Sequence, residues 1–401
     1  VADRLVESST LEKDGVELEV EDIDFPQIME DIRSTRKKWQ ENQKKNISST
    51  ECLDYYETEG RFIDEYTLEM DEVTLRSDKI FIAAGARPLI PPIDGVEEVD
   101  YLTNESILKL ETLPKELVII GGGYVGVEYA HFMDKMGSEV TIIQRGDKIV
   151  KDQDDDISRY LRRKLSERVN IELNTEASGI QKDGTGYKVI GKTKDGDLQS
   201  FYGDEVMIAV GRRPNTDLLE PETTGVETTD RGYIKVDEYL RTSKENIWAF
   251  GDITGKAMFK HVANLEADIA WKNAKRDEKR SLDYQSVPSA VFTDPKIGSV
   301  GLTENEAKKD REVLVGKADY QDIIKGKITD KEGFAKAVVE QDSKKLLGFH
   351  IIGPEAPILL QEVVNVMAQG GAKDDITDGI HTFPTLSRLI PAALDDLEPV
   401  E

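Results

Sequence analysis

The chain has 401 residues, which is long enough for two or three domains with a sizeable core. Its 53 basic and 79 acidic side chains give a net charge of −26, which argues against binding to a nucleic-acid backbone or an anionic membrane surface. No apolar run is long enough to cross a bilayer and no signal peptide is visible, so we expect a cytoplasmic protein.

The first segment, residues 1–103, is polar and mixes helices with short strands. Its single cysteine, Cys52, cannot form an internal disulfide and has no basic neighbour to activate it, so we interpret it as incidental. In chain order the pattern predicts helices at Val1–Val6 and Phe25–Ile47, strands at Tyr56–Ile63 and Thr67–Leu75, and a buried strand at Lys79–Ala84 that ends in Gly85-Ala86-Arg87-Pro88.

An apolar strand that runs into glycines and then into a helix is the most informative stretch. Gly121, Gly123 and Gly126 have the G-x-G-x-x-G spacing. The first glycine makes a tight turn, the second lets a pyrophosphate approach the backbone, and the third lets the helix lie close on the strand. The N–H groups at the helix start, near Tyr124 and Val125, would then face the phosphates. The alternative is a glycine-rich turn that binds nothing.

The segment around this motif, residues 104–232, has the order expected of a nucleotide-binding domain. We expect strands at Lys115–Ile120, Glu139–Ile143, Ile171–Asn174 and Glu205–Val210, helices at Tyr124–Met136 and Asp156–Arg168, and a hairpin around Lys182-Asp183-Gly184. The last strand ends in Gly211-Arg212-Arg213-Pro214, which echoes the earlier Gly-Ala-Arg-Pro. A strand followed by Gly-x-Arg-Pro therefore occurs twice, which indicates two related units.

Residues 233–284 contain a further strand pattern, which ends in Trp248-Ala249-Phe250-Gly251-Asp252. The pattern of strands and helices changes at about residue 285. From 285 to 401 we expect a separate α+β domain with strands at Ser289–Phe292, Ala335–Glu340 and Leu347–Ile352, a helix at Thr303–Lys309 with a Thr303/Glu306 capping box, and an amphipathic helix at Pro357–Gln369.

Three motifs in this order resemble the FAD-dependent pyridine nucleotide-disulfide oxidoreductases. They are Ile82–Pro88, Gly121–Glu128 and Trp248–Asp252; Lys260–Asn264 and Val287–Glu306 look most like the mycothione reductase and dihydrolipoamide dehydrogenase branch. The resemblance implies an α/β protein with two Rossmann-like, three-layer ββα domains and an α+β dimerisation domain. The FAD domain would comprise 1–103 and 233–284, the NAD(P) domain 104–232, and the dimerisation domain 285–401.

The resemblance also implies candidate site residues. The aspartate that matches Asp252 hydrogen-bonds the ribityl chain of FAD in the family, although Gly251-Asp252 would otherwise only cap a turn. Lys260 and His261 would lie against the flavin, or His261 is a structural histidine. Glu128 matches a family glutamate near the nicotinamide and is a candidate catalytic residue, or it is a helix-surface carboxylate. The full set for FAD is Gly85, Asp252, Met258, Lys260, His261 and Ala263, with Gly211 as a further cofactor-binding residue; no metal is expected.

The charges after the second strand indicate whether the chain prefers NADPH or NADH. An NAD-specific loop usually has a carboxylate at the end of the second strand for the ribose 2′-hydroxyl. That position is Gln144, 18 residues after Gly126, and it is followed by Arg145 and Lys151. A neutral amide with two nearby cations favours the 2′-phosphate of NADPH, with NADH as the alternative. The two cations would otherwise only balance Asp147, Asp152 and Asp154.

Two departures from the family limit the functional prediction. The N-terminal FAD loop and the redox Cys-x-x-x-x-Cys have no match, so we expect a fragment of a longer protein rather than a chain without disulfide chemistry. The C-terminal motif has Phe383 and Arg388 where disulfide-reducing relatives have an acid–base His and its Glu, and neither can replace them. Mercuric reductase also lacks that histidine. His381 is the remaining catalytic candidate, but it would serve only if the loop were re-aimed, which we do not expect.

The main hypothesis is an oxidoreductase that passes a hydride from NADPH to FAD and then electrons to a disulfide or another acceptor across a homodimer interface formed by 285–401. One alternative is a reductase of the mercuric type with a non-disulfide acceptor. The other is a non-catalytic remnant that binds the dinucleotide and oligomerises. No nucleic-acid or membrane partner is expected.

Overall fold

The computed structural model describes residues 1–11, 15–16, 19–276 and 279–400. Contacts divide it into two compact units, and each is described by itself. Unit 1 holds residues 1–31, 90–210 and 285–401, and unit 2 holds 32–89 and 211–284. This grouping joins the expected NAD(P) and dimerisation segments, so the four domain limits stay a prediction.

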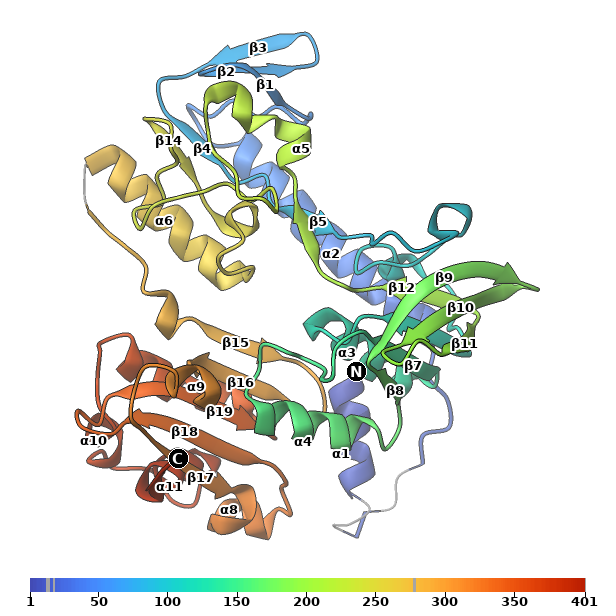
Figure 1. Ribbon diagram of the computed structural model, residues 1–401, viewed down its shortest axis with the longest axis vertical. Helices are drawn as coiled ribbons and strands as arrows, with labels where there is room; N and C mark the ends of the chain where they lie inside the picture. The colour runs from blue at the N-terminus through green and yellow to red at the C-terminus, as the bar shows by residue number, and fades with distance from the viewer. Residues whose placement is uncertain (12–14, 17–18, 277–278, 401) are drawn as a thin grey trace. The chain divides into compact units, whose positions relative to one another are not determined.

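A parallel four-stranded sheet carries the glycine motif in unit 1 (Figure 1). Its strand order is β12-β6-β7-β8. The strands are β6 (Glu116–Ile120), β7 (Glu139–Gln144), β8 (Asn170–Leu173) and β12 (Glu205–Ile208), and the helices beside them are α1 (Ala2–Leu11), α3 (Tyr124–Met136) and α4 (Asp155–Leu165). The predicted helix at 124–136 has the limits of α3, which confirms the strand–glycine–helix order.

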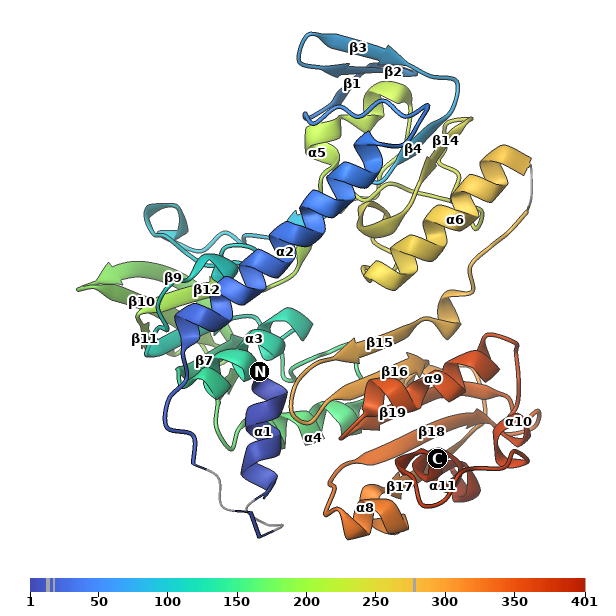
Figure 2. The same cartoon turned by 180° about the vertical axis from the view of Figure 1, so that it is seen from behind.

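A second, antiparallel sheet packs on this parallel sheet and completes a ββα sandwich (Figure 2). It consists of β9 (Thr175–Asp183), β10 (Gly186–Thr193) and β11 (Leu198–Gly203). Val118 and Ile120 of β6 share a core with Ile180 and Val189 of the antiparallel sheet. Ile119, between them in sequence, points to the other face and lies near Gly126 of α3. This alternation buries both faces of the parallel sheet, as its apolar run requires.

The C-terminal part of unit 1 is a six-stranded antiparallel sheet covered by helices (orange to red in Figure 1). Its order is β15-β16-β19-β18-β17-β20. The strands are β15 (Pro288–Val291), β16 (Ile297–Gly301), β17 (Val313–Asp319), β18 (Phe334–Glu340), β19 (Leu346–Ile352) and β20 (Leu397–Pro399); the helices are α7 (Glu304–Ala307), α8 (Ile324–Ile328), α9 (Ala356–Met367), α10 (Asp374–Thr377) and α11 (Leu389–Asp395). The predicted capping box of Thr303 and Glu306 is present at the start of α7.

Unit 2 is built from short strands and two longer helices. Its elements are α2 (Phe25–Ser48, which begins in unit 1), β1 (Arg61–Asp64), β2 (Thr67–Met70), β3 (Val73–Arg76), β4 (Ile80–Ile82), β5 (Ala86–Pro88), β13 (Arg212–Pro214), α5 (Thr216–Leu219), β14 (Ile247–Ala249) and α6 (Lys260–Arg276). The strands pair as β1-β2-β3, as β13-β5, and as the parallel pair β14-β4. The two Gly-x-Arg-Pro segments therefore pair with each other through β5 and β13.

Four predicted elements differ clearly from the structure. The strand expected at 56–63 begins only at Arg61, as β1, and residues 56–60 belong to no strand. The strand expected at 67–75 is a hairpin of β2 and β3, because Asp71 adopts a positive φ of 46° and turns the chain. The helix expected at 156–168 ends at Leu165, although its apolar stripe at Ile157, Leu161 and Leu165 is fully buried. The strand expected at 79–84 is shorter, and only Ile82 in it is buried.

Candidate functional site

The glycine loop between β6 and α3 has the three features that the spacing predicts. Gly121 turns the chain at φ 112°, and a Cβ there would lie 2.5 Å from the Ala209 carbonyl oxygen. A Cβ on Gly126 would lie 2.0 Å from the Gly121 oxygen, so only glycine lets α3 approach the turn. Gly123 has no atom within 4 Å of its absent Cβ, which leaves the start of α3 open to a phosphate.

A segment with two exposed cations follows β7, and we call residues 145–153 the basic loop. Arg145 is 81% exposed and its guanidinium lies 3.4 Å from the Glu176 carboxylate. Lys151 is exposed as well. Asp154, one of the acids expected to balance these cations, pairs with Lys336 instead. The loop also holds Lys148, which pairs with Asp155, and the exposed acids Asp147 and Asp152.

Gln144 at the end of β7 is not open to a ribose in this structure. Its Oε1 accepts a hydrogen bond from the Gly122 N–H at 2.9 Å, and its Nε2 donates to the Lys148 carbonyl at 3.3 Å. The side chain braces the glycine loop against the basic loop. A carboxylate at this position would repel a 2′-phosphate, and the neutral amide of Gln144 does not.

Two side chains of α3 point away from solvent. The Tyr124 hydroxyl accepts a hydrogen bond from Gln153 Nε2, and burial raises the pKa of this phenol. Glu128, one turn later, accepts from the Phe292 N–H at 2.9 Å. Burial raises the pKa of the Glu128 carboxyl, which the Phe292 hydrogen bond partly opposes. Glu128 is therefore not a plain surface carboxylate, whereas Val125, between these residues, is 36% exposed.

The glycines of the paired Gly-x-Arg-Pro segments in unit 2 lie in open turns. Gly85 has φ 69° and Gly211 has φ 140°, and neither has an atom within 4 Å of its absent Cβ. The Leu89 N–H donates to the Gly211 oxygen at 3.0 Å, and the Asn215 N–H donates to the Gly85 oxygen at 3.2 Å. Each turn is thus held by backbone bonds and remains free on its side-chain face.

Asp252 lies in the turn after β14 and is bound by an arginine that the sequence did not single out. Arg212 Nη1 lies 3.1 Å from an oxygen of the Asp252 carboxylate. The Nε of Arg212 is buried without a hydrogen-bond partner within the part of the chain described. The adjacent Gly251 N–H donates to Glu266, a fully buried carboxylate, at 2.6 Å. Asp252 is therefore held firmly, with one oxygen engaged by Arg212.

The remaining residues predicted to contact flavin lie at the start of α6. Met258, Lys260 and His261 are exposed, and the His261 ring stacks on Phe259 at a centroid distance of 5.4 Å. Ala263 lies beside the turn, and its Cβ would be 3.4 Å from a Cβ on Gly251. Open glycine turns, a held carboxylate and an exposed helix start together fit a large polar cofactor such as FAD.

The C-terminal histidine makes its contacts inside its own chain. His381 Nε2 lies 3.0 Å from the Glu362 carboxylate, and Nδ1 lies 3.2 Å from the Gly379 carbonyl oxygen. Both ring nitrogens therefore face acceptors. Phe383, in the same segment, is 65% exposed.

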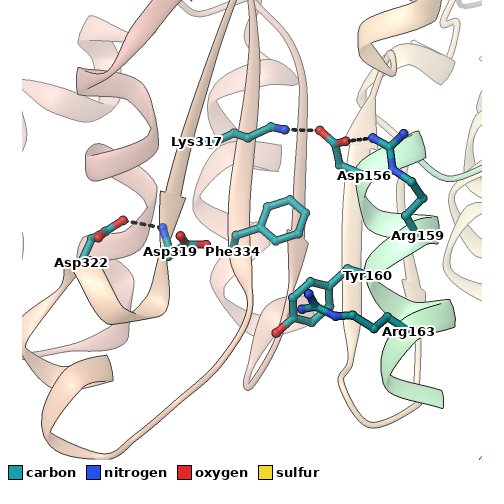
Figure 3. A pocket seen from close by; sticks show the side chains of 8 residues that line it. All are labelled: Asp156, Arg159, Tyr160, Arg163, Lys317, Asp319, Asp322 and Phe334. Carbon is teal, nitrogen blue, oxygen red and sulfur yellow. Dashed lines mark hydrogen bonds and ion pairs between the residues drawn. The ribbon is translucent and has the colours of Figure 1, made fainter. Parts of the chain in front are cut away.

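A cavity of about 380 Å³ lies away from the glycine loop, between α4 and the strands β17 and β18 (Figure 3). Its charged side chains mostly pair with one another. Asp156 bonds both Arg159 and Lys317, and the Arg163 guanidinium lies 4.6 Å from the centre of the Tyr160 ring. None of its lining residues belongs to the glycine loop or the basic loop. Within the described residues no group of three or more His, Cys, Asp or Glu side chains is arranged to hold a metal ion, and no helix has the length and apolarity to cross a membrane.

Comparisons with known proteins identify the family of the chain. The family model described as pyridine nucleotide-disulphide oxidoreductase matches residues 3–267, and the model of the dimerisation domain of that family matches residues 287–394. The chain belongs to this family. It is an FAD-dependent NAD(P)H oxidoreductase of the disulfide reductase type, with the two nucleotide-binding folds and the dimerisation fold that the sequence predicted.

Relatives with three different names are similar to this chain. Dihydrolipoyl dehydrogenase 3 of Haloarcula marismortui is 35% identical over 80% of this chain and 68% of its own length. Mycothione reductase of Mycobacterium tuberculosis is 35% identical over 85% of this chain and 76% of its own length. Mercuric reductase of Staphylococcus aureus is 33% identical over 84% and 62%. Among solved structures, the HOCl-induced flavoprotein disulfide reductase RclA from Escherichia coli has a TM-score of 0.86 and 27% identity, over 98% of this chain and 88% of that one.

The sequence did not identify three residues that contact candidate site residues, namely Gln153 in unit 1 and Arg212 and Glu266 in unit 2. Gln153 stands in an acid-rich run with no recognisable signal. Arg212 stands inside the second Gly-x-Arg-Pro segment. The repeat of this segment indicated related units, but only the structure shows that β5 and β13 pair. Glu266 occupies a helix position where a carboxylate is ordinarily solvated, and only tertiary structure shows that it is buried.

Proposed function

We propose that this chain is an NADPH-dependent reductase that works as a homodimer in the cytoplasm and delivers electrons to a small-molecule acceptor. The observation that carries the proposal is the open face of Gly123 at the start of α3, beside two exposed cations of the basic loop. Backbone N–H groups at a helix start attract a pyrophosphate, and the two cations attract a further phosphate.

The preference for NADPH follows from the charges near the ribose side of the loop. Arg145 is highly exposed and only loosely paired with Glu176, so its guanidinium is available to a 2′-phosphate. Lys151 adds a second cation at the far end of the loop. Gln144 acts indirectly, because it holds the glycine loop and the basic loop in one arrangement.

FAD held by these residues would supply a two-electron relay between the nicotinamide and the acceptor. Asp252 would hold the ribityl hydroxyls with the oxygen that Arg212 leaves free, and the Gly85 and Gly211 turns would let the cofactor approach the backbone. Met258, Lys260, His261 and Ala263 are the candidate contacts for the ring system. Glu128 is the candidate near the nicotinamide.

The first candidate acceptor is a disulfide. The second is an acceptor whose reduction needs no side chain to act as a general acid or base. Phe383 has no proton to transfer, and both nitrogens of His381 face acceptors of the same chain. These observations favour the second candidate. Two of the similar relatives are named mercuric reductases, and a solved structure of RclA is a Cu(II) complex. A metal ion is therefore the acceptor class to test beside a disulfide.

The coenzyme preference can be tested with the FAD-supplemented chain and an artificial quinone acceptor. We expect kcat/KM to favour NADPH over NADH by about tenfold or more, because a phosphate–guanidinium contact contributes roughly 1.5–3 kcal/mol. The double variant Arg145→Ala and Lys151→Ala should lose that advantage while keeping its rate with NADH. Arg163→Ala, an arginine of α4 that stacks on Tyr160, is the matched control. A higher kcat/KM for NADH in the unchanged chain would contradict the proposal.

A further inference from the structure

We propose that Gln153 is a positioning residue that joins the dinucleotide site to the sheet of the dimerisation domain. Its side chain is only 3% exposed. Its Nε2 donates to the Tyr124 hydroxyl and, at 3.2 Å, to Ser289 Oγ; its Oε1 accepts from Ser299 Oγ. A buried amide with both ends satisfied has one orientation, so it fixes the groups that surround it.

Gln153 stands at the end of the basic loop, and that loop is bonded to the glycine loop. The Gln153 N–H donates to the Val150 oxygen at 2.8 Å, and the Val150 N–H donates to the Gly122 oxygen at 2.7 Å. The Gly122 N–H in turn donates to Gln144 at 2.9 Å. These bonds connect the phosphate-facing glycines and the cations of the basic loop into one arrangement. Displacement of Gln153 therefore shifts both.

A second contact holds α3 against the same region of the dimerisation domain. Tyr124 and Glu128 are four residues apart and so lie on one face of α3. Tyr124 reaches Ser289 of β15 and Ser299 of β16 through Gln153, and Glu128 accepts from the N–H of Phe292, just after β15. Both loops of the dinucleotide site are thus held by one hairpin of the neighbouring domain.

This arrangement has a consequence for binding. A site that is already ordered does not lose as much conformational entropy when its ligand binds, so the contacts with Gln153 increase affinity for the dinucleotide. Ser299 is 6% exposed and lies on β16, not on the glycine loop or the basic loop. Its removal should nevertheless weaken dinucleotide binding. The inference rests on the proposed function, in which the glycine loop holds the dinucleotide.

The test is the dissociation constant of the full chain for NADPH and for NADH, measured by fluorescence titration well below the melting temperature. The variants are Gln153→Leu and Ser299→Ala. Gln321→Leu is the matched control, because Gln321 is a half-buried glutamine of the dimerisation domain whose Nε2 donates to the Lys331 oxygen at 3.0 Å. Melting temperature and oligomeric state are measured on every sample, because a purely structural role changes these and leaves the affinity of the folded protein unchanged.

We expect Gln153→Leu to weaken NADPH binding by about tenfold and Ser299→Ala by about threefold, with no change in Gln321→Leu. If Gln153→Leu does not fold, Ser299→Ala decides the question. Unchanged affinity in the folded variants, or an equal loss in the control, overturns the inference alone. Failure of the unchanged chain to bind either dinucleotide overturns the proposed function and the inference with it.

Discussion

His131 is buried on α3 with only 2% of its surface exposed, and its imidazole must remain neutral there. Arg168 Nη2 lies 3.0 Å from Nδ1, so the arginine donates and the histidine accepts. Burial, the largest cause, and the charges of Arg168, Lys135 and Lys296 together lower the pKa of His131 to about 4, although Asp3 opposes them. A proton on this ring would face cations on several sides.

The low pKa makes the stability of the protein depend on pH through this one residue. The unfolded chain binds a proton at His131 below pH 6.5, and the folded chain does so only near pH 4. Its contribution to stability is therefore complete above pH 6.5 and is lost as the pH falls toward 4. The loss reaches about 3 kcal/mol over that range.

We expect His131→Gln to lose less stability than the unchanged chain between pH 7.5 and pH 5. The amide oxygen of glutamine can still accept from Arg168, but glutamine does not titrate. Urea denaturation at the two pH values measures the difference, and the carboxylates that titrate in both proteins cancel in the comparison. An identical pH dependence in the two proteins would show that His131 is not the group responsible.

At the residue scale, sequence reasoning predicted the backbone geometry of the glycine loop better than the contacts of the side chains. The glycines lie as their spacing predicts, because their role depends on the local backbone. Gln144 contacts Gly122, Asp252 contacts Arg212, and His381 contacts Glu362, and each of these partners is distant in sequence. Long-range contacts of this kind leave no periodic signal in one sequence.

At the scale of elements, a buried ion cluster joins α4 to the sheet of the dimerisation domain. Lys336 on β18 is 2% exposed, and its Nζ lies 2.8 Å from Asp154, 3.0 Å from Asp156 and 2.7 Å from Glu304. Burial alone would raise the pKa of Asp156, but hydrogen bonds from Lys317 and Lys336 hold it well below its usual range. Asp156 and Lys317 appear at the rim of the cavity in Figure 3.

Removal of the central cation should destabilise the protein strongly. We expect Lys336→Met to lower the free energy of unfolding by about 3–5 kcal/mol, because it leaves buried carboxylates without a counter-charge. Lys317→Met removes a half-exposed lysine from the same Asp156 and should cost about 1 kcal/mol or less. Urea unfolding at neutral pH measures both. Equal effects of the two substitutions would contradict the central role of Lys336.

The elements themselves were largely predictable, and the exceptions have physical causes. Strong periodicity gave α3 its limits and α4 its buried stripe. The hairpin of β2 and β3 was predicted as one strand because the strand pattern continues on both sides of Asp71. The positive φ of Asp71, which turns the chain, is not visible in the sequence. The pairing of β5 with β13 could be suspected from the repeated Gly-x-Arg-Pro, but a repeat does not specify which strands become neighbours.

At the scale of the whole molecule, exposed apolar side chains of the dimerisation domain indicate how two chains would meet. Ile358 on α9 is 70% exposed, Phe383 is 65% exposed, and Ile380 is completely exposed. The hydrogen bond from His381 to Glu362 holds the segment that contains Ile380 and Phe383 beside α9. A patch of this kind is costly in water and favours a protein partner, and in the proposed homodimer a second copy of the chain would cover it.

We expect Phe383→Glu to shift the protein from dimer to monomer at micromolar concentration, because a charge would be buried in the interface. Leu198→Glu is the matched control, since Leu198 on β11 is 69% exposed and lies outside the dimerisation domain. Size-exclusion chromatography with light scattering measures the mass of each. A monomeric unchanged chain, or a Phe383→Glu variant that remains dimeric, would contradict this interface.

The most direct test of the whole account is the visible absorbance of the flavin after anaerobic addition of NADPH to the FAD-supplemented chain. With FAD kept in excess, we expect NADPH to bleach the flavin absorbance faster than NADH does. A flavin that neither dinucleotide reduces, or that NADH reduces faster than NADPH, would contradict the proposed function.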